Sequence, residues 1–221
     1  MLGKFFSDPA KLMNLTGLLL SGVGTTVSVF ALTLVLSIPL GMLVAFGRMS
    51  RLKIVSKPVS FYIYIMRSTP LMLQVMFLYF LLPQVLPFRF DRFWAVILSF
   101  VINYAAYFAE IFRGGIQAVP PGQKEAAQVL GYSKAQTFFR VVLPQVVKRV
   151  ILPVTNEVIT LVKDTALASV VAITEVLTIA KKQASASVSV DPYIVAMVIY
   201  LILNGIAEQA CKLVERKLNY Y

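Results

Sequence analysis

Long apolar runs separated by short polar gaps make up most of this chain of 221 residues. A helix needs about 20 residues to cross the roughly 30 Å hydrocarbon layer of a bilayer, and five runs are long enough. Five such runs leave too little polar chain to bury them in water, so we predict an all-α, polytopic membrane protein with a single transmembrane domain over residues 1–221. The predicted spans cover residues 22–47, 58–82, 93–116, 152–179 and 192–214.

The segment 117–151 is the one sizeable polar stretch, and it is too long for a simple connection between two spans. It reads as two short helices. Pro120–Pro121 opens the first, and Gly131 ends it because glycine adopts the left-handed conformation readily. The second covers about 133–143 and is expected to end at Pro144. A helical loop of this kind predicts a docking surface for a partner, and a solvated linker is the alternative.

The composition agrees with a surface that faces lipid. Hydrophobic residues make up 58% of the chain and charged residues 14%, against about 45–50% and about 25% in ordinary soluble domains. The N-terminal apolar run is too long for the core of a signal peptide, so we expect it to stay in the mature protein.

The net charge of +11 would suggest nucleic-acid binding in a soluble protein. Here the basic residues lie in short gaps between apolar runs, which argues against that function and favours the rule that Lys and Arg collect on cytoplasmic loops. One set of alternate gaps, with the C-terminal tail, contains Arg48, Arg51, Lys53, Lys57, Arg113, Lys124, Lys134, Arg140, Lys148, Arg149, Lys212, Arg216 and Lys217. The other side contains Lys4, Lys11, Arg89, Arg92, Lys181 and Lys182. We therefore predict an external N-terminus and a cytoplasmic C-terminus.

The chain contains few of the residue types that usually catalyse reactions or bind metals. Cys211 is the single cysteine and histidine is absent, so the chain cannot build a Ser-His or Cys-His catalytic unit by itself. It also lacks a Gly-rich phosphate loop ending in Lys and Ser or Thr. We predict that the chain is not an enzyme, holds no metal and binds no cofactor of its own.

Polar and ionisable residues within the predicted spans mark a candidate substrate pathway, because such groups are costly in a membrane unless they face a cavity or a partner. Spacings of three and four place some of them in stripes on the third and fourth spans. The candidates are Arg67, Thr69, Asn103, Tyr107, Glu110, Glu157, Lys163 and Asp164.

Two interpretations of these residues stay open. They form a site for a small polar solute, with Thr69 and Asn103 offering hydrogen bonds, or Arg67 or Lys163 pairs internally with Asp164. Pro70 has no N–H to donate, so one backbone carbonyl is freed near the middle of the second span.

The polar loop carries a motif that points to one family. It contains Glu125-Ala126-Ala127, then Gly131, then Leu143-Pro144. This pattern resembles the EAA loop of ABC importer membrane subunits, with Val141 standing where that family usually has isoleucine. The motif extends over about 20 residues, and it falls in the loop that charge places in the cytoplasm.

The resemblance covers nearly the whole chain and is to the polar amino-acid uptake branch, which includes histidine, glutamine, glutamate and arginine permeases. Ala166 departs from the serine usual in that branch. The matching stretches are FYIYIMRSTPLMLQ, AAYFAEIFRGGIQAVPPGQKEAAQVLGYS and LVKDTALASVVAITEV.

The resemblance implies the transmembrane subunit of an ATP-driven importer for a polar L-amino acid, in a bacterial inner or plasma membrane. It implies a second membrane subunit, identical or homologous, an external solute-binding protein, and two cytoplasmic ATP-binding subunits that hold ATP and magnesium. The residues implied in coupling to the ATPase are Glu125, Ala126, Ala127, Gly131, Leu143 and Pro144.

The residue types in the loop suit a rigid coupling element. Ala126 and Ala127 are small, strong helix formers that would let a helix lie close in a groove of the ATPase. Glu125 would sit at the rim of the groove, and Gly131 would allow the turn that follows.

Two other classes of protein remain as alternatives. An ion-driven secondary transporter would explain the charges in the spans, but five spans without an internal repeat fit it poorly. A membrane scaffold that docks a cytoplasmic partner would explain the loop but not those charges. Within the spans acids outnumber bases, which favours a cationic or zwitterionic amino acid over an acidic one.

Overall fold

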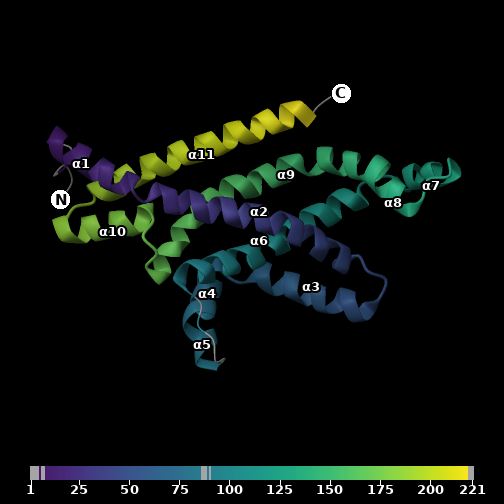
Figure 1. Cartoon of the computed structure of the whole chain (residues 1–221), viewed down its shortest axis with the longest axis horizontal. Helices are drawn as coiled ribbons and strands as arrows, with labels where there is room; N and C mark the ends of the chain where they lie inside the picture. The colour runs from purple at the N-terminus through teal and green to yellow at the C-terminus, as the bar shows by residue number, and fades with distance from the viewer. Residues whose placement is uncertain (1–4, 6–7, 86–88, 90, 219–221) are drawn as a thin grey trace.

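The computed structural model describes residues 5, 8–85, 89 and 91–218, and every regular element among them is a helix (Figure 1). The elements labelled η are two π-helical turns (η1, η2) and one 3₁₀ helix (η3). In chain order, the helical elements are α1 (Pro9–Leu20), α2 (Val23–Arg48), α3 (Lys53–Ser68), α4 (Leu71–Met76), η1 (Phe77–Leu81), α5 (Leu82–Val85), α6 (Arg92–Gln117), α7 (Pro121–Val129), α8 (Lys134–Gln136), η2 (Thr137–Val142), α9 (Leu143–Asp164), η3 (Thr165–Val171), α10 (Val176–Ser187) and α11 (Asp191–Leu218).

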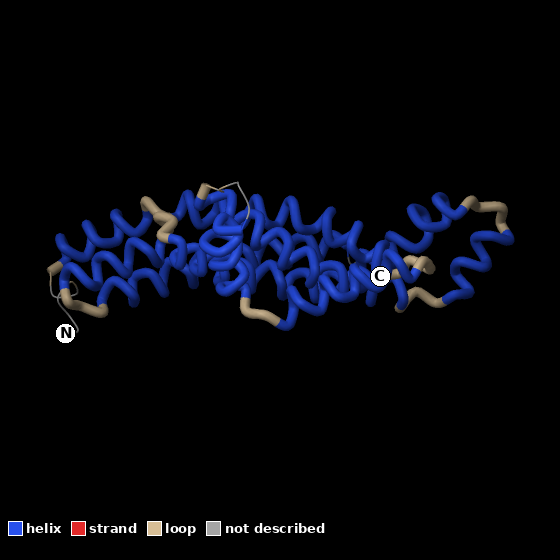
Figure 2. The backbone as a smooth tube through the Cα atoms, turned by 90° about the horizontal axis from the view of Figure 1, so that it is seen from below, coloured by secondary structure: helices blue, strands red, loops and turns tan. Residues whose placement is uncertain are grey.

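The helices form an elongated bundle whose long axis follows α2, α6 and α9 (Figures 1 and 2). α6 contacts both α2 and α9, and α11 packs along α9. α7 and α8 project at one end of the bundle, whereas α1 and α10 lie at the other end (Figure 1). The polar loop is therefore presented at one extremity of the molecule.

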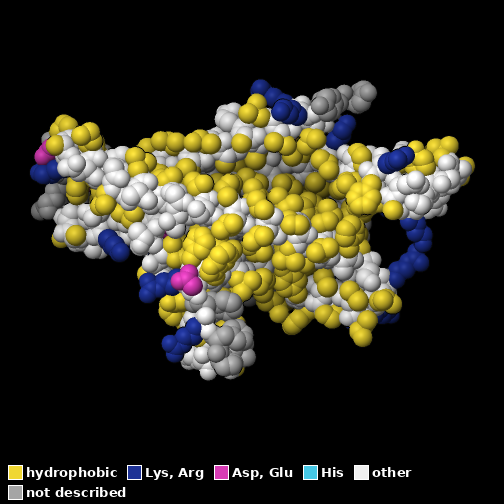
Figure 3. All heavy atoms as spheres, viewed as in Figure 1, with side chains coloured by type: hydrophobic (Ala, Val, Ile, Leu, Met, Phe, Trp, Pro, Cys, Tyr) yellow, Lys and Arg dark blue, Asp and Glu magenta, His cyan; other side chains and the backbone are white. Residues whose placement is uncertain are grey.

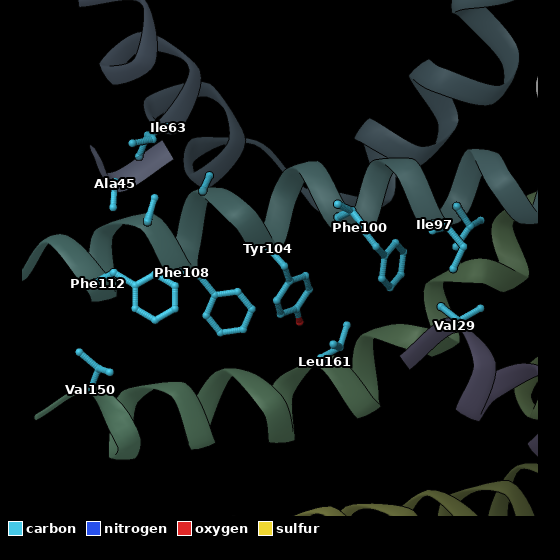
Figure 4. Packing of buried hydrophobic residues seen from close by; sticks show 14 of the residues in the cluster. Val29, Ala45, Ile63, Ile97, Phe100, Tyr104, Phe108, Phe112, Val150 and Leu161 are labelled. Atoms are coloured by element: carbon cyan, nitrogen blue, oxygen red, sulfur yellow. The ribbon is translucent and has the colours of Figure 1, made fainter. Parts of the chain in front are cut away.

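α6 is the central helix of the core. Four aromatic side chains at intervals of four residues, Phe100, Tyr104, Phe108 and Phe112, form one buried stripe along it. They point toward α9 (Figure 4), and successive rings from Tyr104 onward lie about 6 Å apart (6.2 and 6.0 Å between centroids). Residues four apart share one helix face, so this spacing produces a continuous apolar seam.

α2 approaches α6 closely because its buried face carries small residues. Thr33, Ser37, Gly41 and Ala45 repeat every four residues and are all buried. A Cβ atom added at Gly41 would lie 2.7 Å from the Cβ of Phe108 and 3.1 Å from the Ala105 carbonyl oxygen. The absence of a side chain at Gly41 therefore sets the distance between the two helices.

Gly41→Ala is expected to destabilise the protein by about 1–3 kcal/mol, because the added methyl group overpacks the α2–α6 contact. Thermal unfolding in detergent measures this effect. Gly24→Ala is the matched control on the same helix, since a Cβ atom there meets nothing within 4 Å. An unchanged unfolding temperature for Gly41→Ala would contradict the packing shown here.

The described residues include three helices long and apolar enough to cross a membrane: Pro9–Arg48, Arg92–Gln117 and Asp191–Leu218. Lys53–Ser68 and Leu71–Val85 form a fourth candidate that is bent by 108°. Hydrophobic side chains cover the middle of the face in Figure 3, with most Lys and Arg near its margins. The fold confirms a polytopic helical protein, while the count of five spans stays a prediction.

The predicted fourth span, residues 152–179, is not one continuous helix. α9 ends at Asp164 and gives way to η3, after which Ala172 adopts a left-handed conformation with φ of 56° before α10 begins. A left-handed residue cannot continue a right-handed helix, so the chain changes direction there. The stretch is predominantly apolar, so its composition did not indicate that the helix ends within it.

The polar loop follows the prediction in its first half and departs from it in the second. α7 begins at Pro121, and Gly131 takes a φ of 81°. The predicted helix end at Pro144 is wrong, because this residue lies in the first turn of α9. The π-helical turn η2 precedes it, with the Leu143 N–H bonded to the Phe138 carbonyl five residues back. This wider turn lets the helix run through the proline.

Candidate functional site

α7 presents a mixed polar and apolar surface at the projecting end of the molecule. Glu125 and Ala126 are exposed, and the large side chains of Val129 and Leu130 are 88% and 76% exposed. Ala127 is only 3% exposed. Of the two alanines expected to face a partner, the structure places only Ala126 on the surface.

Backbone and side-chain hydrogen bonds end α7 and begin α8. The Tyr132 N–H donates to the Ala127 carbonyl and the Gly131 N–H to the Gln128 carbonyl, both at 3.0 Å. This pattern ends a helix when the residue after its cap is left-handed. Ser133 then begins α8 with a capping box that includes Gln136. The chain continues through η2 into α9, which contains Leu143 and Pro144.

The predicted pathway residues of α3 and α6 lie around the break between α3 and α4. The Arg67 guanidinium lies over the ring of Tyr107, 5.3 Å from its centroid, which is within the range of a cation–π contact. The Asn103 amide nitrogen donates to the Met66 carbonyl and to the Gln74 side-chain oxygen, both at 2.9 Å. Thr69 also contacts Gln74.

Glu110 already has basic partners. Its Oε2 lies 2.6 Å from Nη2 of Arg113, and Arg113 Nε donates to both carboxylate oxygens at 3.1 Å. Arg48 approaches the same carboxylate at 3.8 Å. The ion pair with Arg113 lies within α6, whereas the contact with Arg48 links α6 to the end of α2.

The α9 residues differ in their partners. Asp164 accepts a 2.7 Å hydrogen bond from the Tyr104 hydroxyl of α6, which points toward α9 in Figure 4. Within the described residues no ion pair joins Asp164 to Arg67 or Lys163, so the internal pairing considered above does not form. Lys163 is exposed, and Glu157 is half-buried with no hydrogen bond or ion pair among the described residues.

Arg67 therefore contacts Tyr107, and its positive charge acts on Glu110 and Glu157. Sequence reasoning missed Gln74 and Tyr104. Gln74 follows Pro70 by four residues. At this spacing a side chain can hydrogen-bond the backbone carbonyls that the proline leaves without a donor, so the spacing could have identified Gln74 from the sequence.

The fold and the site define a polytopic helical membrane protein with a cluster of charged and aromatic residues between its helices and an exposed helix at one end. Residues 37–220 match the family model of the binding-protein-dependent transport system inner membrane component. The chain belongs to this family.

Curated relatives extend the similarity over nearly the full length. The octopine transport system permease protein OccM of Rhizobium radiobacter is 39% identical over 221 residues, covering 94% of this chain and 89% of that protein. The arginine transport system permease protein ArtQ of Bacillus subtilis (strain 168) is 36% identical over 201 residues, covering 90% of this chain and 92% of that protein.

A solved structure described as an amino acid ABC transporter with histidines has a chain of the same fold. It superposes with a TM-score of 0.87 at 32% identity, covering 98% of this chain and 100% of that chain. Because the match spans both chains almost completely, the two chains share one arrangement of helices.

Proposed function

We propose that this chain is the membrane subunit of an ATP-driven importer of polar amino acids, forming the passage and coupling it to a separate ATPase. The observation that carries the proposal is the exposed surface of α7, joined to α9 through α8 and η2, in a chain similar to amino-acid permease subunits over nearly its whole length. The passage is lined by side chains of α3, α6 and α9.

The coupling residues act through one stiff helix. A partner bound to the exposed face of α7 moves the helix as a body. Ala127 is buried against the rest of the chain, and the N–H groups of Gly131 and Tyr132 close the end of the helix with two backbone hydrogen bonds. Glu125 at its exposed face suits a basic side chain on the ATPase. Val129 and Leu130 supply apolar area that contact with the partner would bury.

The solute passage contains acidic side chains that are not paired with a basic residue. Glu110 is paired with Arg113, but among the described residues Asp164 forms no ion pair and Glu157 has a carboxylate without a bonded partner. A carboxylate of this kind binds a cationic side chain well. Together with the relatives named for octopine and arginine transport, this favours an amino acid with a guanidinium or ammonium side chain.

The proposal includes the rest of the assembly. A second membrane subunit completes the passage, two ATP-binding subunits hold ATP and magnesium on the cytoplasmic side, and an external binding protein delivers the solute. The proposed location is a bacterial inner or plasma membrane. The N-terminus lies outside and the C-terminus in the cytoplasm, because the side rich in Lys and Arg is expected to be cytoplasmic. The comparisons give no support to a secondary transporter or a scaffold.

Reconstitution tests the proposed function. Proteoliposomes containing this chain, its ATPase and its binding protein are expected to accumulate radiolabelled L-arginine only when ATP is present on the ATPase side. Vesicles with ADP and an imposed proton or sodium gradient are the control. Accumulation driven by the gradient without the ATPase would support a secondary transporter, and no accumulation of any amino acid would support a scaffold.

A further inference from the structure

The break between α3 and α4 leaves a specific backbone group in need of a donor. In a continuous helix the Met66 carbonyl would accept a hydrogen bond from the N–H of residue 70, but Pro70 has none. Thr69 is extended, with φ of −118° and ψ of 146°. A buried carbonyl without a donor is unfavourable, most of all inside a membrane.

Two side chains replace the missing donor. The Gln74 amide nitrogen donates to the Met66 carbonyl at 3.1 Å and the Asn103 amide nitrogen donates to the same oxygen at 2.9 Å. Gln74 also donates to the Thr69 carbonyl at 3.2 Å and to the Thr69 hydroxyl at 2.7 Å. The two N–H groups of Gln74 are therefore shared among three acceptors at the break, and Asn103 is a second donor to the Met66 carbonyl.

Gln74 and Asn103 are also bonded to each other, since the Gln74 oxygen accepts from the Asn103 amide at 2.9 Å. The two amides link three elements: the end of α3, the start of α4 and the middle of α6. Asn103 uses both of its N–H groups in these bonds, and the Gln74 nitrogen is directed at the break.

We propose that Gln74 is a positioning residue that fixes the 108° bend of the second span and, through the bend, the placement of Arg67 and Thr69 against α6. Asn103 serves the same network and does not act as a free ligand for the solute through its N–H groups. The bend borders a cavity of about 700 Å³ whose lining includes Thr69, Gln74 and Ser99, so its angle also sets the shape of that cavity.

A simpler account is that Pro70 alone bends the chain and Gln74 only fills space. The two accounts differ in what happens when the amide is removed with the shape kept. Methionine has nearly the length and volume of glutamine but no N–H to donate. Gln84 is the matched control, because it lies in the same bent span, in α5, and among the described residues it donates only to the Phe80 carbonyl of its own turn.

The test measures the bend directly in the full chain, assembled with its ATPase in nanodiscs. After Cys211→Ala, spin labels are attached at cysteines replacing the exposed Tyr64 and Val85, one on each arm. Gln74→Met is expected to broaden the distance distribution and to move its mean by about one helical turn, roughly 5 Å. Gln84→Met should leave the distribution as in the parent protein. An unchanged distribution in Gln74→Met overturns the proposal.

A rescue keeps the proposal testable if Gln74→Met accumulates poorly. Gln74→Met removes one of the two side-chain donors to the Met66 carbonyl, and Pro70→Ala restores a backbone N–H opposite that carbonyl. Pro70→Ala/Gln74→Met is therefore expected to recover the yield of inserted protein. Failure of this recovery, with poor accumulation of the single variant, counts against a role in satisfying that carbonyl.

The consequence for transport rests on the proposed function, whereas the bend does not. Gln74→Met should raise the L-arginine concentration that half-saturates uptake by about tenfold, while Gln84→Met leaves it unchanged. A changed distance with unchanged half-saturation supports the role of Gln74 in the bend and argues against a solute site at Arg67 and Thr69.

Discussion

Replacing Ala126 with tryptophan is expected to lower solute uptake by about tenfold or more while the protein still reaches the membrane. Ala126 is exposed on α7, at the end of the molecule that projects from the bundle (Figure 1). A large ring there contacts nothing essential within the chain but prevents close approach of a partner. Overpacking of a contact costs about 1–3 kcal/mol, so coupling should fall by about tenfold or more.

The measurement compares uptake with the amount of inserted protein and with recovery of the ATPase on co-purification. Ala31→Trp makes the same substitution at an exposed alanine on the apolar outer face of α2, and it should keep normal uptake. Glu125→Lys reverses the charge beside Ala126 and should reproduce the loss. Full transport with normal co-purification in both α7 variants would refute the assignment of this surface.

Glu157→Gln is expected to change which solutes are carried. Its carboxylate has no hydrogen bond or ion pair among the described residues, so the substitution breaks no such contact there. The positive charge of Arg67 acts electrostatically on this carboxylate. A charged hydrogen bond contributes about 1.5–3 kcal/mol. The L-arginine concentration for half-maximal uptake should therefore rise about tenfold or more, with a much smaller change for L-glutamine.

Asp164→Asn is the matched comparison on the same helix. Asp164 accepts the Tyr104 hydroxyl at 2.7 Å and joins α6 to α9, so its change should weaken uptake of both amino acids to a similar degree. Equal losses for L-arginine and L-glutamine in Glu157→Gln would assign that residue a structural role instead.

Several features of the site were predictable because they depend on positions close together in the chain. Pro70 has no N–H, so a freed carbonyl near the middle of the second span follows from the residue alone. Gly131 takes the left-handed conformation that its place after α7 required. The stripe of Asn103, Tyr107 and Glu110 lies on one face of α6, because residues three and four apart share a face.

Other features depended on how helices meet. By charge, Asp164 was a candidate partner for Arg67 or Lys163. In the structure, however, α6 is oriented so that the Tyr104 hydroxyl donates a hydrogen bond to Asp164. Pro144 is a helix breaker by local rule, yet the π-helical turn before it lets α9 continue through the loop boundary.

The order of residues by itself determined the class of protein, the rigid polar loop, and the point at which the second span loses a backbone donor. These depend on apolar length, on backbone chemistry and on the period of the helix. Only the tertiary structure decided that Gln74 and Asn103 supply that donor and that Ala127 faces inward. The reason is physical: a side chain's partner is set by the depth and rotation of the neighbouring helix, and spacing along one helix does not contain that information.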